Sequence, residues 1–210
     1  IHPKLAHGAF RNIKWVALIL LLAIYYVTPW LRWDRGEGRV NQAVMIDFDA
    51  GRFYFFFIEL WPQEVYYITG LLILAALGIF LSSALFGRVW CGYACPQTVF
   101  TQVLVWLERA FEGDRAKQLR LAKSWTLERV VRQSAKGVTG SLVAGAAAVS
   151  AVGYFVPIRE LLARLATGTA APASYGAVVL LTGAVVLFAG RLREQVCIYM
   201  CPYARFQSAM

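Results

Sequence analysis

The sequence predicts an all-helical (all-α), polytopic membrane protein with about four transmembrane helices and shorter interfacial or re-entrant helices. Hydrophobic residues make up 59% of the 210-residue chain and charged residues only 16%, which is more apolar surface than a soluble domain needs. Four apolar runs approach the ~20 residues that cross a bilayer core. Two cysteine motifs of the form CxYxCP follow apolar segments, so the chain resembles two similar halves.

The predicted spans are residues 15–31, 65–86, 137–156 and 174–190. The first two contain no charge, whereas the other two are rich in small residues that suit close helix packing in lipid. A fifth apolar stretch, residues 98–111, is shorter than the other runs, which favours an interfacial or re-entrant helix over a full span.

The connecting segments also carry patterns. Residues 32–64 are rich in aromatic side chains, which predicts a segment lying in the membrane interface. A basic stretch with Lys117, Arg120 and Lys123 predicts a helix lying on the membrane surface.

The distribution of Lys and Arg predicts the orientation. With four spans, the N-terminus, residues 87–136 and the C-terminus share one side and hold 15 of the 21 basic residues, while loops 32–64 and 157–173 hold six. Positively charged loops stay in the cytoplasm, so we predict that the N-terminus and both motifs are cytoplasmic. The net charge of +9 is then a topology signal, and nucleic acid is not a predicted partner.

Residues 1–14 form a basic lead that we expect to contact anionic lipid, and residues 15–210 form the transmembrane module. The chain begins with Ile1 rather than Met and ends at Met210, just past the second motif. We therefore expect a fragment of a longer protein. The first apolar run is too long for the apolar region of a signal peptide, and Arg32, Trp33, Asp34 and Arg35 follow it in place of a small-residue cleavage site.

The two motifs, CGYACP at 91–96 and CIYMCP at 197–202, contain every cysteine of the chain. The candidate ligands for a metal or cofactor are therefore Cys91, Cys95, Cys197 and Cys201. Cysteines four apart project from one helix face, and the proline after each pair is best tolerated as the first residue of a new helix. The dipole of that helix would favour anionic sulfur.

Each copy is similar only to the tail of the bacterial ferredoxin run CxxCxxCxxxCP. The two upstream cysteines are replaced by Leu85 and Arg88 in the first copy and by Arg191 and Glu194 in the second. Neither copy alone supplies four thiolates. If the second and fourth spans pack side by side, the four cysteines can complete one site.

Four interpretations remain open at this point: one metal site joining both pairs (iron–sulfur or copper), two separate two-thiolate copper sites, a dithiol/disulfide relay, and cysteines without chemistry. Met200 adds a soft thioether that is a further candidate metal ligand. Tyr93 and Tyr199 share a position in the two copies, and their hydroxyls could bond to cluster sulfur.

Longer blocks resemble the FixG/RdxA/CcoG family of membrane polyferredoxins, described as cytochrome c oxidase accessory proteins. The resemblance covers nearly the whole chain and rests on residues 29–36, 42–43, 52–55, 60–63, 87–98, 112–115 and 193–207. Three positions depart from the family pattern: Phe57 replaces an expected glycine, Phe100 a usual tryptophan, and Gly137 a frequent histidine.

The resemblance implies a multi-pass protein of the bacterial inner membrane that transfers electrons and reduces Cu(II) to Cu(I) for assembly of a cbb-type cytochrome c oxidase. It implies [4Fe-4S] clusters, chiefly on a downstream ferredoxin domain that this chain lacks, and cluster or copper ligands at the CxxxCP motifs. Implied partners are copper ions, oxidase subunits, copper chaperones and membrane lipid. The oligomeric state is open, a homodimer included.

Two rival functions belong to other classes. A non-catalytic assembly scaffold or membrane anchor would use the cysteines only to hold a structural metal. A thiol oxidoreductase would form a reversible disulfide between Cys91 and Cys95.

Overall fold

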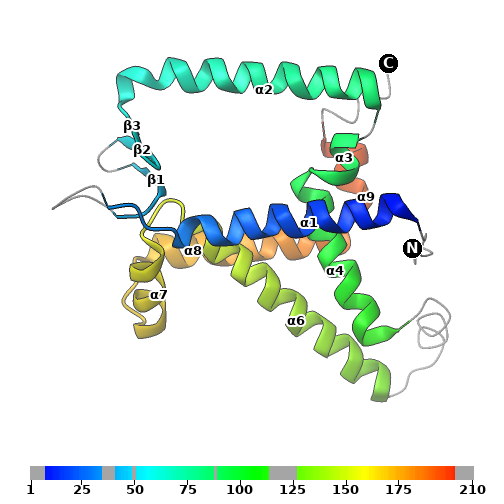
Figure 1. Ribbon diagram of the computed structural model, residues 1–210. Coiled ribbons are helices and arrows are strands. Elements are labelled where there is room, and N and C mark those ends of the chain that lie inside the picture. The colour runs from blue at the N-terminus through cyan, green and yellow to red at the C-terminus, as the bar shows by residue number, and fades with distance from the viewer. Residues whose placement is uncertain (1–7, 35–40, 49–50, 88, 114–126, 202–210) are drawn as a thin grey trace. The chain divides into compact units, whose positions relative to one another are not determined.

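The computed structural model of the chain describes residues 8–34, 41–48, 51–87, 89–113 and 127–201. Four of its helices are long and apolar enough to cross a membrane, as the sequence predicted. They cover Ala9–Trp30, Pro62–Phe86, Val130–Val152 and Pro172–Arg191, and Figure 1 shows their order along the chain. The basic stretch predicted to form a surface helix lies mostly outside the described residues.

Short helical turns extend the first two spans. Helix α1 (Ala9–Val27) continues into the 3₁₀ turn η1 (Thr28–Trp30), and η2 (Pro62–Glu64) leads into α2 (Val65–Phe86). Prolines are tolerated here because each stands in the first turn of its helix.

The third span lies closer to the N-terminus than the sequence predicted. Helix α6 runs over Leu127–Val152, whereas the apolar run extended to residue 156. The chain leaves the helix at Gly153, and the next helix, α7, covers Ile158–Thr167. A Cβ atom at Gly153 would lie 3.1 Å from Cδ1 of Ile158, so a side chain there would push the two segments apart.

The fourth span changes helix type before it ends. Helix α8 (Pro172–Val185) is regular, and η3 (Val186–Arg191) is a π-helix. The short α9 (Arg193–Gln195) and a second π-helical segment, η4 (Val196–Met200), follow. Short π segments are rare overall but frequent at functional sites. Here η3 precedes the second cysteine motif and η4 contains Cys197.

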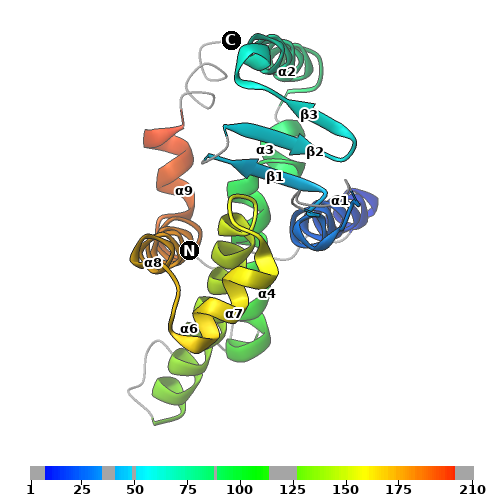
Figure 2. The ribbon, with the colours of Figure 1, turned by 90° about the vertical axis from the view of Figure 1, so that its left-hand side faces the viewer.

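A small antiparallel sheet was not predicted and corrects the all-α description. Strands β1 (Val44–Asp47), β2 (Arg52–Phe55) and β3 (Ile58–Leu60) pair in the order β1-β2-β3, as Figure 2 shows. The aromatic residues that indicated a membrane-interface segment are also good strand formers. The tight turns between strands contain Gly51 and Phe56, both with positive φ.

The described residues divide into two compact units. One comprises the described parts of Ile1–Leu18, Cys91–Ala144 and Thr182–Met210, and the other comprises those of Ile19–Trp90 and Gly145–Leu181. All four cysteines belong to the first unit. The second contains the sheet and α7.

Hydrogen bonds hold the second unit together around the end of α6. The Gln42 side-chain amide donates to the Gly153 carbonyl at 2.6 Å, and the Ile46 amide donates to the Tyr154 carbonyl at 2.8 Å. The Tyr154 hydroxyl donates to the Tyr25 carbonyl at 2.9 Å. These bonds fix the strand segment and the first span against the turn after the third span.

Candidate metal centre

The first cysteine motif lies at a junction between two helices. Cys91 is part of the short helix α3 (Val89–Tyr93), and Cys95 is the extended N-cap residue of α4 (Pro96–Glu112). A residue before proline is pushed out of the helical region, so Pro96 both forces this break and begins the new helix. The Thr98 hydroxyl donates to the Cys91 carbonyl at 2.6 Å and closes the junction.

This junction confirms that a new helix begins at the first motif proline. It also confirms a helix over residues 98–111, within α4. The two cysteines do not share one continuous helix face, because the backbone is extended at Cys95.

The second motif repeats this local backbone with a different helix type. Cys197 lies in the π-helical segment η4, and Cys201 follows it in an extended conformation with φ −81° and ψ 111°. The Cys201 amide donates to the Val196 carbonyl at 2.9 Å. Pro202 and the residues after it lie outside the described residues, so a helix beginning there stays a prediction.

Electrostatics relate the two cysteine pairs. Burial raises the pKa of the Cys197 thiol, and the charges of Cys95 and Cys201 raise it further. Cys95 of the first copy therefore lies within electrostatic reach of Cys197 of the second. All four cysteines are half-buried thiols and none of them forms a disulfide.

The thiols of the two motifs are near one another, but they are not arranged around a common metal position. Within the described parts of the chain, no three Cys, His, Asp or Glu side chains are placed to hold one metal ion. The donor set nevertheless has the number and softness that a [4Fe-4S] cluster requires, namely four thiolates from two pairs. Cys91, Cys95, Cys197 and Cys201 are the residues that would hold such a group.

Met200 and Tyr199, two further predicted contributors, are mostly exposed. The side chain of Met200 is 63% exposed and that of Tyr199 is 69% exposed. A ligand role for Met200 stays a prediction.

One face of α4 connects the first motif to the segment before the second. Gln97, Thr101, Leu104 and Glu108 recur at helical spacing along this face. The Gln97 side-chain amide donates to the Phe188 carbonyl of η3 at 2.8 Å. The side chain of Leu104 lies beside Gly140 of α6 and Gly190 of η3, at distances where an added Cβ atom would make an ordinary van der Waals contact.

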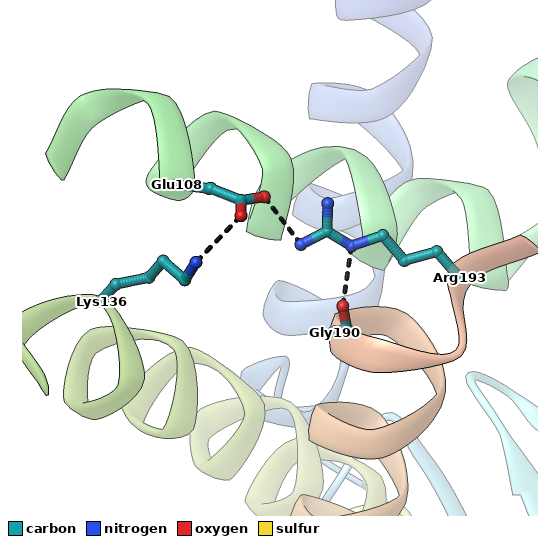
Figure 3. Close-up of polar contacts among 4 residues, drawn as sticks. All are labelled: Glu108, Lys136, Gly190 and Arg193. Carbon is teal, nitrogen blue, oxygen red and sulfur yellow. Dashed lines mark hydrogen bonds and ion pairs between the residues drawn. The ribbon is translucent and has the colours of Figure 1, made fainter. Parts of the chain in front are cut away.

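Glu108, the last of the four residues on this face of α4, forms two ion pairs (Figure 3). Its carboxylate lies 2.9 Å from Nζ of Lys136 on α6 and 2.8 Å from Nη2 of Arg193, four residues before Cys197. Arg193 also donates from Nε to the Gly190 carbonyl at 2.8 Å. The carboxylate therefore joins α4, α6 and the entrance to the second motif.

The ionisation of Glu108 follows from these contacts. Burial favours the neutral acid, but the hydrogen bonds and charges of Lys136 and Arg193 outweigh burial and hold the pKa of Glu108 below its usual value. The carboxyl group is thus ionised at neutral pH. Its side chain is only 15% exposed, which limits screening by water.

Sequence reasoning found the cysteines but assigned no role to Gln97, Leu104 or the Glu108 ion pairs. The repeat of Gln97, Thr101, Leu104 and Glu108 at helical spacing was the available signal. This spacing places the four residues on one face of a helix, but it does not show which residues the face contacts.

Comparisons with known proteins agree with this chemistry. Residues 68–112, which include Cys91 and Cys95, match the family described as a 4Fe-4S binding domain. The whole chain is 45% identical to the nitrogen fixation protein FixG of Rhizobium meliloti (strain 1021) and 46% identical to the proteins RdxB and RdxA of Cereibacter sphaeroides. It covers 40%, 44% and 45% of those proteins, respectively. No solved structure matches the chain.

Four helices of membrane-spanning length and a match to a 4Fe-4S binding domain define the class as a membrane-associated protein with an iron–sulfur binding region. Identity of 45–46% over the whole chain confirms the resemblance found in the sequence. The chain belongs to the FixG/RdxA family and spans less than half the length of the relatives it matches.

Proposed function

We propose that this chain is the membrane module of an electron-transfer protein in which Cys91, Cys95, Cys197 and Cys201 together bind one metal centre. We further propose that the protein reduces Cu(II) to Cu(I) for the assembly of a cbb-type cytochrome c oxidase. The observation that carries the first proposal is the connection between the two motifs. Gln97 and Glu108, on the helix that follows the first motif, contact the segment that leads into the second.

The proposed site is an iron–sulfur centre in preference to two copper sites, because the 4Fe-4S family match includes the first pair. A [4Fe-4S] cluster, when bound, supplies one electron at a time, which is what reduction of one Cu(II) ion to Cu(I) requires. The chain contributes soft thiolate donors. The N-terminus of α4 directs its positive dipole end toward Cys95 and favours an anionic sulfur ligand there.

The proposed location is the bacterial inner membrane, with both motifs on the cytoplasmic side. The excess of Lys and Arg in the N-terminus, residues 87–136 and the C-terminus supports this orientation. A cytoplasmic donor would then reduce the centre, and copper ions, oxidase subunits or copper chaperones would be the partners.

The test uses the full-length protein purified anaerobically in detergent. The protein is reduced with dithionite, freed of excess reductant and given Cu(II), and Cu(I) is detected with a chromogenic chelator. We expect Cys91→Ser and Cys197→Ser each to lose about four iron atoms per chain and most of the Cu(I) formation. The control, Ser83→Ala, removes a hydroxyl that bonds only within its own helix and should change neither.

The outcomes separate the parts of the proposal. Unchanged iron in both cysteine variants rules out these thiolates as ligands. Lost iron with unchanged Cu(I) formation rules out electron transfer through this site and favours a structural metal.

A further inference from the structure

A groove of about 100 Å³ opens in the second unit at the end of the first span. Three segments line it: residues 29–32 after α1, Asn41 with Gln42, and residues 157–159 at the start of α7. A single water needs roughly 10–15 Å³ of such space, so the groove has room for a group of several heavy atoms.

Backbone bonds hold these segments in place. The Trp33 amide donates to the Asn41 carbonyl and the Ala43 amide to the Leu31 carbonyl, both at 2.9 Å. Gln42 is buried and its side-chain amide bonds to Gly153, ahead of α7. The groove is therefore formed by the fold and does not depend on exposed side chains alone.

The groove is positively charged. Among the described residues that line it, the ionisable ones are Arg32 and Arg159, and neither guanidinium forms an ion pair with a described residue. The neighbouring carboxylate of Glu160 is held by Arg164, 2.5 Å away. Two arginines lining one groove suit a phosphate group, which accepts several guanidinium hydrogen bonds.

Helix α7 adds to this charge. It begins at Ile158, in the wall of the groove, and its N-cap residue Pro157 makes no side-chain bond to the first-turn amides. The N-terminus of a ten-residue helix presents unsatisfied amide groups and a partial positive charge, and both favour an anion.

The position beside a span indicates the source of the phosphate. The groove begins where the span Ala9–Trp30 ends, which is the depth at which lipid headgroups meet the hydrocarbon core. Trp30 is 51% exposed, and Val27 and Ile24 continue an exposed apolar surface along the same helix. This surface gives an acyl chain a path away from the groove, which a free phosphate ion would not use.

We propose that this groove binds the phosphate group of an anionic phospholipid, with Arg32 and Arg159 as the charged ligands. The site is separate from the proposed metal centre, since its residues belong to the other unit. The bound lipid would join the end of the first span to α7.

The test titrates full-length protein in detergent with dioctanoyl phosphatidylglycerol. Binding is followed by tryptophan fluorescence, and bound lipid is counted by native mass spectrometry. We expect Arg32→Gln or Arg159→Gln to weaken binding about tenfold and the double variant about a hundredfold, because each loses a charge-assisted hydrogen bond. The control, Glu160→Gln with Arg164→Gln, removes an ion pair of the same helix outside the groove without changing the net charge, and should change affinity by about twofold or less.

Two further measurements keep the proposal open to refutation. Arg32→Lys with Arg159→Lys keeps both charges but loses the planar forks, and should bind with an affinity between the wild type and the double Gln variant. Equal affinity in the wild type, the Lys pair and the Gln pair overturns the proposal. Inorganic phosphate that displaces the lipid at equal concentration overturns the lipid assignment, because the apolar surface would then contribute nothing.

Discussion

The two cysteine motifs reach a similar local backbone by different routes. In the first copy, Pro96 begins a regular helix and Thr98 closes the turn on Cys91. In the second copy, the chain enters through one π-helix and places Cys197 in another. The first copy is thus fixed by its own neighbours in the sequence, whereas the second depends on contacts from α4. This difference predicts that changes on α4 should disturb the second motif more than the first.

The largest expected effect comes from removing Glu108. Glu108→Ala leaves Lys136 and Arg193 with no carboxylate between them, and should lower the free energy of unfolding by about 2 kcal/mol, between the values for exposed and buried ion pairs. Unfolding in mixed micelles measures this. Alkylation of the motif cysteines, read by mass spectrometry, should accelerate more at Cys197 than at Cys91.

The exposed ion pair of α7 supplies the control for Glu108. Glu160→Ala breaks a pair whose side chains are 55% and 49% exposed and should cost about 0.5 kcal/mol or less. Equal losses in the two variants would show that the Glu108 contacts have no special role.

Lowering the pH should weaken the ion pairs of Glu108 with Lys136 and Arg193 without a mutation. Because the pKa of Glu108 is lowered in the folded protein, its stabilisation is fully present above the pKa of the unfolded carboxyl group. It is lost as the pH falls below that value and through the lowered folded pKa. Unfolding measured from neutral to acidic pH should show a steeper loss for the wild type than for Glu108→Gln. Parallel curves would mean that Glu108 does not titrate as described.

Gln97 tests the contact nearest to the first motif. Gln97→Leu leaves the Phe188 carbonyl of the π-helix without its side-chain donor and should cost about 1 kcal/mol. Gln102→Leu, on the same helix but without a hydrogen bond to any described residue, should change stability by about 0.5 kcal/mol or less. Faster alkylation of Cys197 in Gln97→Leu alone would show that the Gln97 contact supports the second motif. Equal alkylation in both variants would show that it does not.

The smallest effect is expected at Thr101, on the same face of α4. Its hydroxyl oxygen is buried and finds no partner within the described part of the chain. Thr101→Val keeps the shape and removes the unsatisfied group, so stability should stay the same or rise by up to about 1 kcal/mol. Thr139→Val, which loses a bond to the Ala135 carbonyl, should be less stable. A loss at Thr101 as large as that at Thr139 would indicate a partner for the Thr101 hydroxyl.

The spans were predictable because each is a local apolar run, and Pro96 marked a helix start by its own geometry. The sheet at Val44–Leu60 was not predictable, since the same aromatic residues suit a membrane interface and a strand. The hydrogen-bonded pairing of the three strands, which the sequence does not show, distinguishes the two. The Gln97 contact joins residues 91 positions apart and the Glu108–Lys136 contact residues 28 apart. A single sequence shows the face of α4 but not its partners.

The π-helices lay beyond prediction for a related reason. The sequence of residues 186–191 is that of the end of an apolar span, and its composition does not distinguish an α-helix from a π-helix. The Gln97 bond at Phe188 and the Arg193 bond at Gly190 accompany that turn, and both are properties of the folded chain.

The most direct test of the central claim asks whether the two cysteine pairs share one metal centre. Iron content and the electron paramagnetic resonance spectrum of the reduced full-length protein are compared for Cys91→Ser, Cys197→Ser and the double variant. One shared centre predicts that each single variant loses the same signal and about four iron atoms per chain, and that the double variant loses no more. Additive losses in the double variant, or an unchanged spectrum in either single variant, would contradict the account.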